Sequence, residues 1–475
     1  MSLTTSSAAS PTSLEILARR LGGALAVPGD DTYSRLATPW NVAVQTRPVA
    51  VVEARNVQDI VASVRYAASA GLAVAVQATG HGVATSMDDT LLIHTGRLDE
   101  CVVHPDGWAR VGAGVRWQQV IDAGARHGLA GLCGSAPHVG VVGYTTGGGL
   151  GPVARTHGFA SDHVRAIEVV TGGGELRRAT RDHEPDLFWG LRGGKGALGV
   201  VTALEFDLLP ISEVYGGALY FDGADAESVL HTWATWCAAL PEEATTSVAL
   251  LRLPPLPGVP EPLAGRPTIA VRFVWTGDPA QGEALLATMR AAGTPLIDAV
   301  SVMPYAAIGA VHADPVDPMP THEATDLLRE LPAAAVDALL GVAGPATDSP
   351  QVIVELRQLG GAIARDPQVP SALCHREAGF LLNVIGVLVP ETVHVVPAHA
   401  EQVRSALAPW ATGGAFPNFA PHEGPERMKR SYDARTLSRL TALAERYDPH
   451  RLFRVGQVPS RPDHPTALDH TKELS

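Results

Sequence analysis

The sequence is poor in features that mark several protein classes. Its 475 residues include four cysteines, which are widely spaced and form no Cys-x-x-Cys pair: Cys101, Cys133, Cys237 and Cys374. Inert thiols in a reducing compartment are therefore expected rather than disulfides or a metal centre. Eighteen histidines are present, but no His-x-x-x-His or His-Glu-x-x-His spacing accompanies them, so we expect no metal site.

Excess positive charge and long apolar runs are also missing. The formal net charge of −13 argues against a nucleic-acid or anionic-membrane partner, since either would favour a basic face. No apolar run is long enough for a transmembrane helix. Residues 1–10 have neither a basic start nor an apolar core, so they resemble a frayed tail more than a secretory signal. We therefore expect a cytoplasmic protein.

Two common nucleotide-binding signatures are incomplete. Gly112-Ala113-Gly114 is followed by Trp117 where a Gly-x-Gly-x-x-Gly motif needs its third glycine, which disfavours a classical dinucleotide fold. The run Gly193-Gly194-Lys195-Gly196 lacks the glycine spacing and the Gly-Lys-Ser/Thr of a phosphate loop. An NTPase is therefore not expected.

Two glycine-rich segments are present instead. His81 lies between Gly80 and Gly82, after the apolar run 72–76 and before the apolar run 91–93, which predicts a tight loop between two strands. Glycine allows positive φ or close approach to a ligand, and successive N–H groups in such a loop can hold an anion such as a pyrophosphate. The run 147–149 is three further glycines. A lone glycine-flanked histidine is most often a plain turn residue, but two such segments in order are more specific.

Further motifs surround these loops. The N-terminal ones are Thr79-Gly80-His81-Gly82, Val139-Gly140 with Gly147-Gly148-Gly149, Asp162, and the runs 186–194 and 198–202; the C-terminal ones are the runs 416–419 and 447–453. Through them residues 48–210 resemble the PCMH-type FAD-binding domain of the vanillyl-alcohol-oxidase superfamily, and within it the berberine-bridge-enzyme-like oxidases. The C-terminal runs resemble the last segment of the same family.

The resemblance implies FAD as cofactor, attached covalently through His81. Relatives with a second link have a cysteine where this chain has Ala136, so a single link is expected. Val139 matches a position associated with oxygen access, and Tyr144 one that approaches the flavin pyrimidine edge; core packing is the alternative for both. The residues expected to contact FAD are Gln77, Ala78, Thr79, Gly80, His81, Gly82, Ser86, Ala136, Pro137, Val139, Gly140, Gly143, Tyr144, Gly147, Gly148, Gly149, Gly199, Val201 and Asn418.

The chain is expected to be an α+β protein with an interrupted FAD-binding domain. Residues 1–210 and 410–475 form that domain, and residues 211–409 form an inserted substrate domain with an antiparallel sheet backed by helices. Asn56 and Gly71 are expected to cap the two ends of one helix, and Pro449 to follow another. In the insert, alternating patterns predict strands at 269–275, 352–358 and 379–389, and helices near 322–342 and 398–409.

Period-two alternation separates two faces of the strand at 352–358. Val352, Val354 and Leu356 share one face, so Glu355 and Arg357 share the other. Asn383 is likewise the polar exception in its strand. If helices cover the apolar face, the other face can roof a cavity over the flavin, as the resemblance implies. The alternative for Glu355 and Arg357 is a solvated ion pair on an exposed sheet face.

The expected function is oxidation of a small molecule by hydride transfer to FAD, followed by electron transfer to dioxygen. Phe416 stands where the family has the tyrosine of a Tyr-x-Asn motif, and Phe419 also lacks a phenol. The candidates for proton removal are therefore Glu355, Tyr144 and His138, with Arg357 beside the first. Burial would raise the pKa of Glu355 and Arg357 would lower it. A dehydrogenase with another acceptor, a redox-neutral cyclase and a ligand-sequestering protein remain alternatives. The sequence leaves open whether the substrate is an alcohol, an amine or a hemiacetal, and the oligomeric state.

Overall fold

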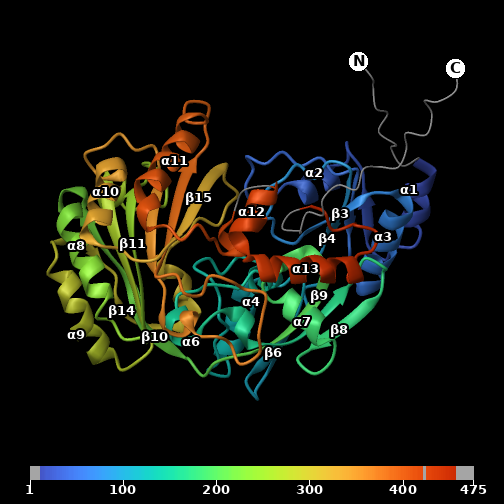
Figure 1. Ribbon diagram of the computed structural model, residues 1–475, viewed down its shortest axis with the longest axis horizontal. Coiled ribbons are helices and arrows are strands. Elements are labelled where there is room, and N and C mark those ends of the chain that lie inside the picture. Colours follow the sequence, from blue (N-terminus) through green and yellow to red (C-terminus); the bar gives the residue numbers. More distant parts are fainter. Residues whose placement is uncertain (1–10, 421–423, 456–475) are drawn as a thin grey trace.

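A computed structural model describes residues 11–420 and 424–455 of the chain; the expected N-terminal tail and the last twenty residues lie outside this part. Two lobes lie side by side (Figure 1). One contains two small sheets and most of the N-terminal half of the chain. The other contains one large sheet with helices against it.

The first small sheet has the strand order β1-β2-β4-β3, with β4 parallel to both β2 and β3. Helix α3 (Val57–Ala70) begins at Asn56, whose side chain accepts a hydrogen bond from the Asp59 N–H, and ends at Gly71 with φ of 68°. Both caps confirm the expectation from sequence. The strands are β1 (Ala24–Ala26), β2 (Ala50–Glu53), β3 (Ala73–Gln77) and β4 (Thr90–His94); helices α1 (Pro11–Ala18) and α2 (Asp31–Ala37) belong to the same region.

The second small sheet is antiparallel, in the order β5-β6-β9-β7-β8. Its strands are β5 (Cys101–His104), β6 (Trp108–Gly112), β7 (Val164–Val170), β8 (Leu176–Thr180) and β9 (Val200–Asp207). The helices that pack around it are α4 (Trp117–Ala125), α5 (Val141–Thr146), α6 (Ala154–His157) and α7 (Pro185–Leu191). The predicted loop with His81 joins β3 to β4, and the run Gly147–Gly149 follows α5 directly.

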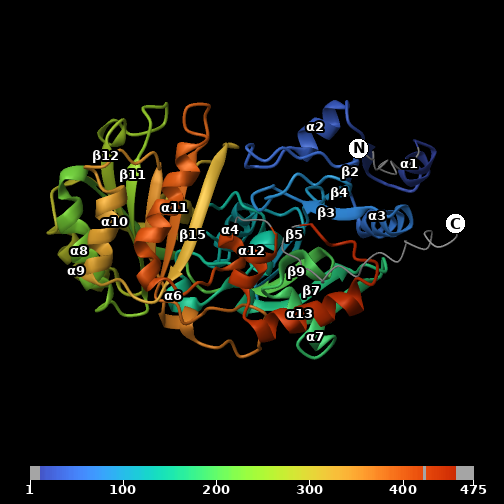
Figure 2. The ribbon, with the colours of Figure 1, turned by 45° about the horizontal axis from the view of Figure 1, so that its top comes forward.

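The large sheet is antiparallel, in the order β13-β10-β12-β11-β16-β17-β15, with β14 also paired to β10. Its strands are β10 (Glu213–Asp222), β11 (Ala244–Arg252), β12 (Pro267–Trp275), β13 (Pro295–Asp298), β14 (Ser301–Pro304), β15 (Thr321–Leu328), β16 (Ile353–Gln358) and β17 (Phe380–Val387). Helices α8 (Ala226–Cys237), α9 (Pro279–Arg290), α10 (Ala333–Ala343) and α11 (Val395–Leu407) cover one face, as Figures 1 and 2 show.

The two faces of this sheet differ in chemistry. The helix-covered face carries a core that includes Val271, Phe273, Val354, Leu356 and Leu382. The opposite face carries polar side chains and is turned toward the other lobe. The expected alternation in β16 is therefore observed, except that Val352 lies just before the strand and faces the cavity described below.

The prediction of one helix from the sequence is only partly correct. Residues 322–342 do not form one helix, because Thr321–Leu328 is strand β15 and only Ala333–Ala343 is helical. Eight residues of β15 pair in antiparallel register with β17, from Thr321 opposite Val387 to Leu328 opposite Phe380. This tertiary pairing overrides the local pattern.

The chain ends against the first lobe. Helix α12 (Gly424–Ser431) is followed by α13 (Ala434–Tyr447), which begins at Asp433 as N-cap. Leu440, Leu443 and Tyr447 of α13 join the core around the second small sheet. The expected helix before Pro449 is confirmed, and it lies beside α7, a segment about 250 residues earlier (Figure 1).

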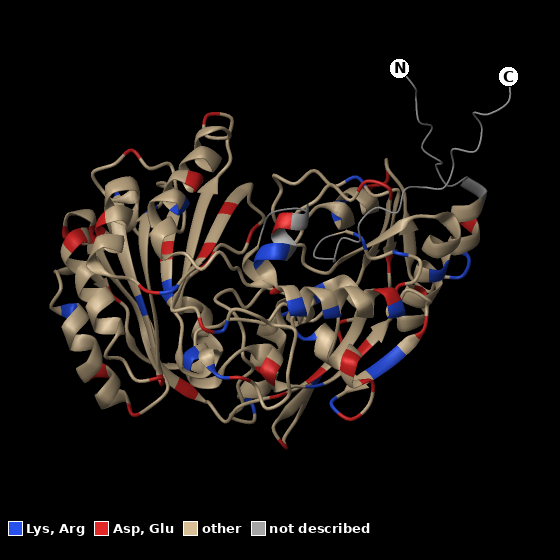
Figure 3. Ribbon diagram, viewed as in Figure 1, with Lys and Arg blue, Asp and Glu red and all other residues tan. Residues whose placement is uncertain are grey.

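Charged residues of both signs are interspersed over the two lobes (Figure 3). Among residues 11–420 and 424–455, no helix is long and apolar enough to cross a membrane. The same residues contain no group of three or more histidine, cysteine or acidic side chains placed to hold a metal ion.

Candidate active site

One cavity of about 500 Å³ lies between the lobes, and both contribute to its lining. Residues 77–85 and most of 134–146 form one side, which we call the loop wall. Strands β15, β16 and β17, with Arg272 of β12, form the opposite side, which we call the sheet wall. The cavity is therefore continuous from the glycine-rich loops to the polar face of the large sheet.

His81 is held tightly in the loop wall. Its Nδ1 lies 2.9 Å from Thr79 Oγ1, and its ring stacks on Trp40 with a centroid distance of 5.1 Å and lies 5.0 Å from the ring of His138. Burial, followed by the nearby His138 and Arg116, lowers the pKa of His81 to about 3. The imidazole is therefore neutral at neutral pH, and its buried Nε2 has no hydrogen-bond partner among the described residues.

Gly80 shows why this loop needs glycine. Its φ is 79°, and a Cβ at this position would lie 2.7 Å from the Trp40 backbone nitrogen and 2.8 Å from Pro39 Cα. Gly82 meets no such obstacle, since the nearest atom to a Cβ there is Lys195 Nζ at 3.7 Å. Gly80 thus brings the loop against residues 39–40 and sets Trp40 over His81.

The second part of the loop wall surrounds α5. Val139, Gly140 and Tyr144 line the cavity, and the Asn418 amide donates a 2.7 Å hydrogen bond to the Tyr144 carbonyl. The Tyr144 hydroxyl is buried without a partner among the described residues, and burial raises the pKa of this phenol well above its usual value. Ala136, Gly143, Gly199 and Val201 also line the cavity, as does every expected residue from Gln77 to Gly82.

Five expected cofactor contacts lie outside the lining. Ser86 bonds to Asp88 on the surface, and Pro137 packs near Gly309. The glycine run lies behind the wall: a Cβ on Gly147 would lie 2.1 Å from Asn418 Oδ1, one on Gly148 3.0 Å from Leu373, and one on Gly149 2.6 Å from the Tyr144 ring. The close packing at Gly147, Gly148 and Gly149 thus leaves little room for a side chain, and their contact with a cofactor stays a prediction.

Glu355 on the sheet wall is buried, with a side chain only 3% exposed. It accepts hydrogen bonds from Arg272 Nη1 at 2.7 Å, Arg357 Nε at 2.7 Å and Ser247 Oγ at 2.8 Å. Burial alone would raise the pKa of Glu355, but the Arg357 and Arg272 guanidiniums outweigh it and hold this pKa well below its usual range. The alternative of a solvated surface ion pair is thus wrong.

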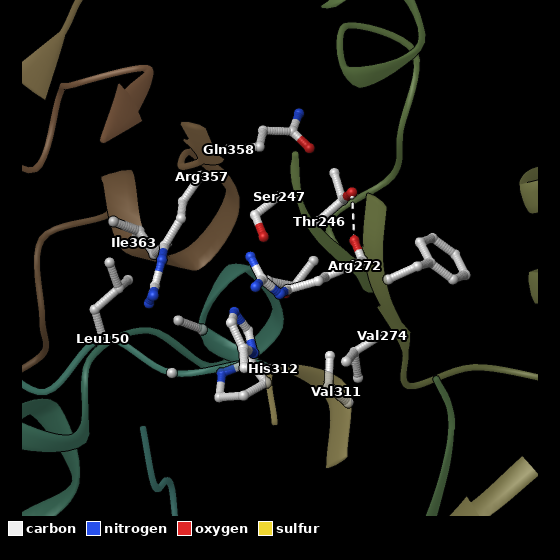
Figure 4. Close-up of a pocket in the computed structure, with 15 residues that line it drawn as sticks. Leu150, Thr246, Ser247, Arg272, Val274, Val311, His312, Arg357, Gln358 and Ile363 are labelled. Carbon is white, nitrogen blue, oxygen red and sulfur yellow. Dashed lines mark hydrogen bonds between the residues drawn. The ribbon is translucent and has the colours of Figure 1, made fainter. Parts of the chain in front are cut away.

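Behind this ion cluster lies a small chamber of about 30 Å³, shown in Figure 4. Ser247, Arg272, His312 and Arg357 point into it (Figure 4). His312 Nε2 lies 3.5 Å from Glu355 Oε1 without a hydrogen bond, and Arg272 Nε and both His312 nitrogens have no partner among the described residues. A chamber of this size and polarity fits one or two buried water molecules.

The geometry argues against Glu355 as a proton acceptor. Both carboxylate oxygens are held by guanidinium groups, and a carboxylate with a strongly lowered pKa is a weak base. Glu355 instead positions Arg357, whose Cζ lies 5.7 Å from the Phe419 ring centroid at the edge of the cavity. Arg357 lines the cavity as expected, and its side chain is 15% exposed.

Several residues of the cavity were not expected from sequence. Trp40, Lys195, Arg272, Asp314 and Glu323 all line it. Lys195 lies in the glycine run that lacks the phosphate-loop pattern, and Glu323 lies in the segment expected to be helical. Arg272 could have been predicted, because the alternating pattern at 269–275 places it on the face of the strand opposite Val271 and Phe273.

Cys133 lies outside the cavity lining. It is fully buried beside the Tyr305 hydroxyl, 3.8 Å away, and burial raises the pKa of its thiol to about 12. A thiol in this environment is neutral and unreactive. Ala136, the residue at the family's cysteine position, is the one that lines the cavity.

The cavity suits a large, elongated ligand with many hydrogen-bonding groups. Six residues of its lining carry buried polar atoms without partners among the described residues: Gln77 Oε1, His81 Nε2, Tyr144 Oη, Arg272 Nε, Thr321 Oγ1 and Asn383 Oδ1. Buried polar atoms without partners are rare in proteins, and a bound ligand can supply the missing hydrogen bonds. The residues present therefore fit a flavin nucleotide along the loop wall.

Comparison with known proteins agrees with this geometry. Residues 48–180 match the family of the FAD binding domain. The chain is 23% identical to an FAD-linked oxidoreductase of Dictyostelium discoideum over 87% of this chain and 89% of the relative. It is 28% identical to the (R)-6-hydroxynicotine oxidase of Paenarthrobacter nicotinovorans over 62% of this chain and 63% of that enzyme.

A solved structure shows the same fold. The Physcomitrella patens BBE-like 1 protein superposes with a TM-score of 0.82 at 20% identity, covering 95% of this chain and all of that one. The match spans both lobes, including the large antiparallel sheet. The chain therefore contains an FAD-binding domain, has the fold of the berberine-bridge-enzyme-like protein, and is similar over most of its length to an FAD-linked oxidoreductase.

Proposed function

We propose that this protein is an oxidase of a small alcohol, amine or hemiacetal, with FAD attached covalently and only through His81. The observation that carries the proposal is the continuity of one cavity from His81 on the loop wall to charged side chains on the sheet wall. A flavin along the loop wall would leave space for a small substrate against the sheet. The flavin, when bound, accepts a hydride at N5 and passes the two electrons to dioxygen.

The protein's own residues supply position and charge. Gln77 to Gly82, Gly140 and Tyr144 would hold the cofactor, chiefly through backbone groups. His81 is suited to covalent attachment, because a neutral imidazole with one unpartnered nitrogen is a competent nucleophile toward the flavin 8-methyl position. Cys133 is unsuited to a second link, since it is neutral and outside the cavity lining.

The direct test is a substrate panel with purified flavin-loaded protein. The panel contains 6-hydroxynicotine, xylobiose, cellobiose, glucose and benzylic alcohols, and the readout is hydrogen peroxide release. We expect at least one compound to bleach the flavin under anaerobic conditions and to give one peroxide per turnover in air. Flavin reduced without reoxidation by oxygen would indicate a dehydrogenase, turnover without oxygen a redox-neutral cyclase, and binding without turnover a sequestering protein; each would contradict the oxidase.

A further inference from the structure

Three carboxyl groups line the cavity: Asp314, Glu323 and Glu355. Glu355 is fully engaged by two arginines and a serine. Asp314 lies in the segment that leads into β15. The Glu323 side chain makes no hydrogen bond and no ion pair within the described part of the chain, although the residue is only partly exposed. It is thus an unengaged carboxyl group on the substrate side of the cavity.

The sheet register fixes where Glu323 lies. It pairs with Ile385 of β17, and Thr325, two residues on, pairs with Asn383. Asn383 in turn pairs with Glu355 of β16. Glu323, Asn383 and Glu355 therefore lie on the same face of the sheet, the one turned toward the flavin lobe. In both ribbon views β15 lies at the side of the large sheet nearest that lobe (Figures 1 and 2).

The surroundings of Glu323 make it a stronger base than its neighbour. Burial, followed by the negative charge of Asp314, raises the pKa of Glu323, whereas arginines lower that of Glu355. A carboxylate whose pKa lies closer to neutral is a more effective proton acceptor. The other charged or titratable groups on the cavity walls are His81, His138, Tyr144, Lys195, Arg272, Asp314, Glu355 and Arg357.

The remaining candidates are less suited to this task. The pKa of Tyr144 is raised well above its usual value by burial, so its phenol stays protonated. Burial lowers the pKa of His138, which weakens it as a base, and its ring lies against His81 on the loop wall. Phe416 and Phe419 have no ionisable group. Glu323 is therefore the carboxyl group that lies on the sheet wall and has no hydrogen-bond or ion-pair partner for its side chain within the described residues.

We propose that Glu323 is the catalytic base of the oxidation, which rests on the proposed oxidase function. The substrate has a carbon bearing hydrogen next to an O–H or N–H group. Its C–H bond breaks with both electrons, and the hydride passes to the flavin. The O–H or N–H proton passes to the Glu323 carboxylate, and a C=O or C=N bond forms. Oxygen then takes the two electrons with two protons, the one from Glu323 and the hydrogen that left the substrate carbon, and leaves as hydrogen peroxide.

A first experiment needs no substrate. Infrared difference spectra of the flavin-loaded protein, recorded across a pH titration, would report the C=O stretch of a protonated carboxyl group. As the pH is lowered, we expect this band to appear at a pH higher than the one at which glutamate usually becomes protonated. The band should be missing in Glu323→Gln and present in Glu355→Gln. A band that survives Glu323→Gln, or no such band in the wild type, would overturn the assignment.

A second experiment measures anaerobic flavin reduction by stopped flow with whichever panel compound reduces the wild type. Glu323→Gln should slow reduction by about 10²- to 10⁴-fold with flavin content unchanged. In the wild type the rate should rise with pH through the raised pKa of Glu323, and this dependence should vanish in the variant. Glu323→Asp, which keeps a carboxylate, should restore part of the rate.

The matched control is His322→Gln, which changes the neighbouring residue of β15 on the opposite face of the strand. It should leave both the rate and its pH dependence unchanged. Reduction of Glu323→Gln at the wild-type rate would refute the base while leaving the oxidase intact. A wild-type protein that no panel compound reduces, or that binds no flavin, would instead refute the proposed function.

Discussion

The loop wall consists mostly of small residues such as glycine, alanine, threonine and valine, whereas the sheet wall includes carboxylate, guanidinium and amide side chains. The loop wall comes from two short continuous segments, 77–85 and 134–146. The sheet wall collects single residues from four strands that are far apart in the sequence. The first design suits a large cofactor that one continuous segment contacts along its length. The second suits a substrate, because single side chains can change without disturbing the backbone.

The largest effect is expected at His81, on the loop wall. If that wall holds a flavin linked only through His81, His81→Ala should lose all covalent flavin, and His138, the other histidine that lines the cavity, should not replace it. The measurement is in-gel flavin fluorescence of denatured protein. His104→Ala, which changes a histidine stacked on Trp108 outside the cavity, should remain fluorescent. Fluorescent His81→Ala protein would show that the link lies elsewhere.

On the sheet wall the main effect on stability is expected from Glu355→Gln. Removing this charge leaves Arg272 and Arg357 buried without their counterion, which should lower the free energy of unfolding by about 3–5 kcal/mol. The matched control is Glu242→Gln, which breaks the exposed pair with Arg365 and should cost at most about 1 kcal/mol. Denaturant unfolding of both variants would check this, and equal losses would contradict a buried cluster.

The same cluster predicts a pH dependence. Because the pKa of Glu355 is lower in the folded than in the unfolded chain, its stabilisation is complete above the unfolded value of about 4.3. It is lost as pH falls through the lower folded value. The melting temperature of the wild type should therefore fall more steeply below about pH 4 than that of Glu355→Gln. Parallel curves would show that Glu355 is not stabilised in its charged form.

The smallest effect is expected at Val139, where the loop wall would control access of oxygen. Val139→Leu should slow reoxidation of the reduced flavin by oxygen several-fold and leave anaerobic reduction unchanged, because the larger side chain narrows the space beside the flavin. Stopped-flow measurement of the two half-reactions separates these effects. Equal slowing of both would indicate a packing defect and not a gate.

The difference between the walls also explains what the sequence could predict. The His81 loop, the two caps of α3 and the helix before Pro449 were predictable, because each depends on residues that are neighbours in the chain. The polar face of β16 was predictable from alternation. The state of Glu355 was not, because it depends on Arg272, which is 83 residues away in sequence and two strands away in the sheet.

One error arises from contacts between distant parts of the chain. Glu323 was missed because residues 322–342 were expected to be helical, and only pairing with β17 makes Thr321–Leu328 a strand. The deciding contacts come from a strand more than fifty positions away, which no local pattern contains.

The central claim is that the loop wall binds the flavin and the sheet wall binds the substrate. An experimental structure of the flavin-loaded protein would test this claim most directly. We predict isoalloxazine density between the walls, continuous with the His81 side chain, with the carboxyl groups of Glu323 and Glu355 on the opposite side of the substrate space. Flavin density joined to another residue would contradict the loop wall as the attachment site. An isoalloxazine ring that lies away from β15 and β16 would contradict the claim that the substrate binds between the flavin and the sheet wall.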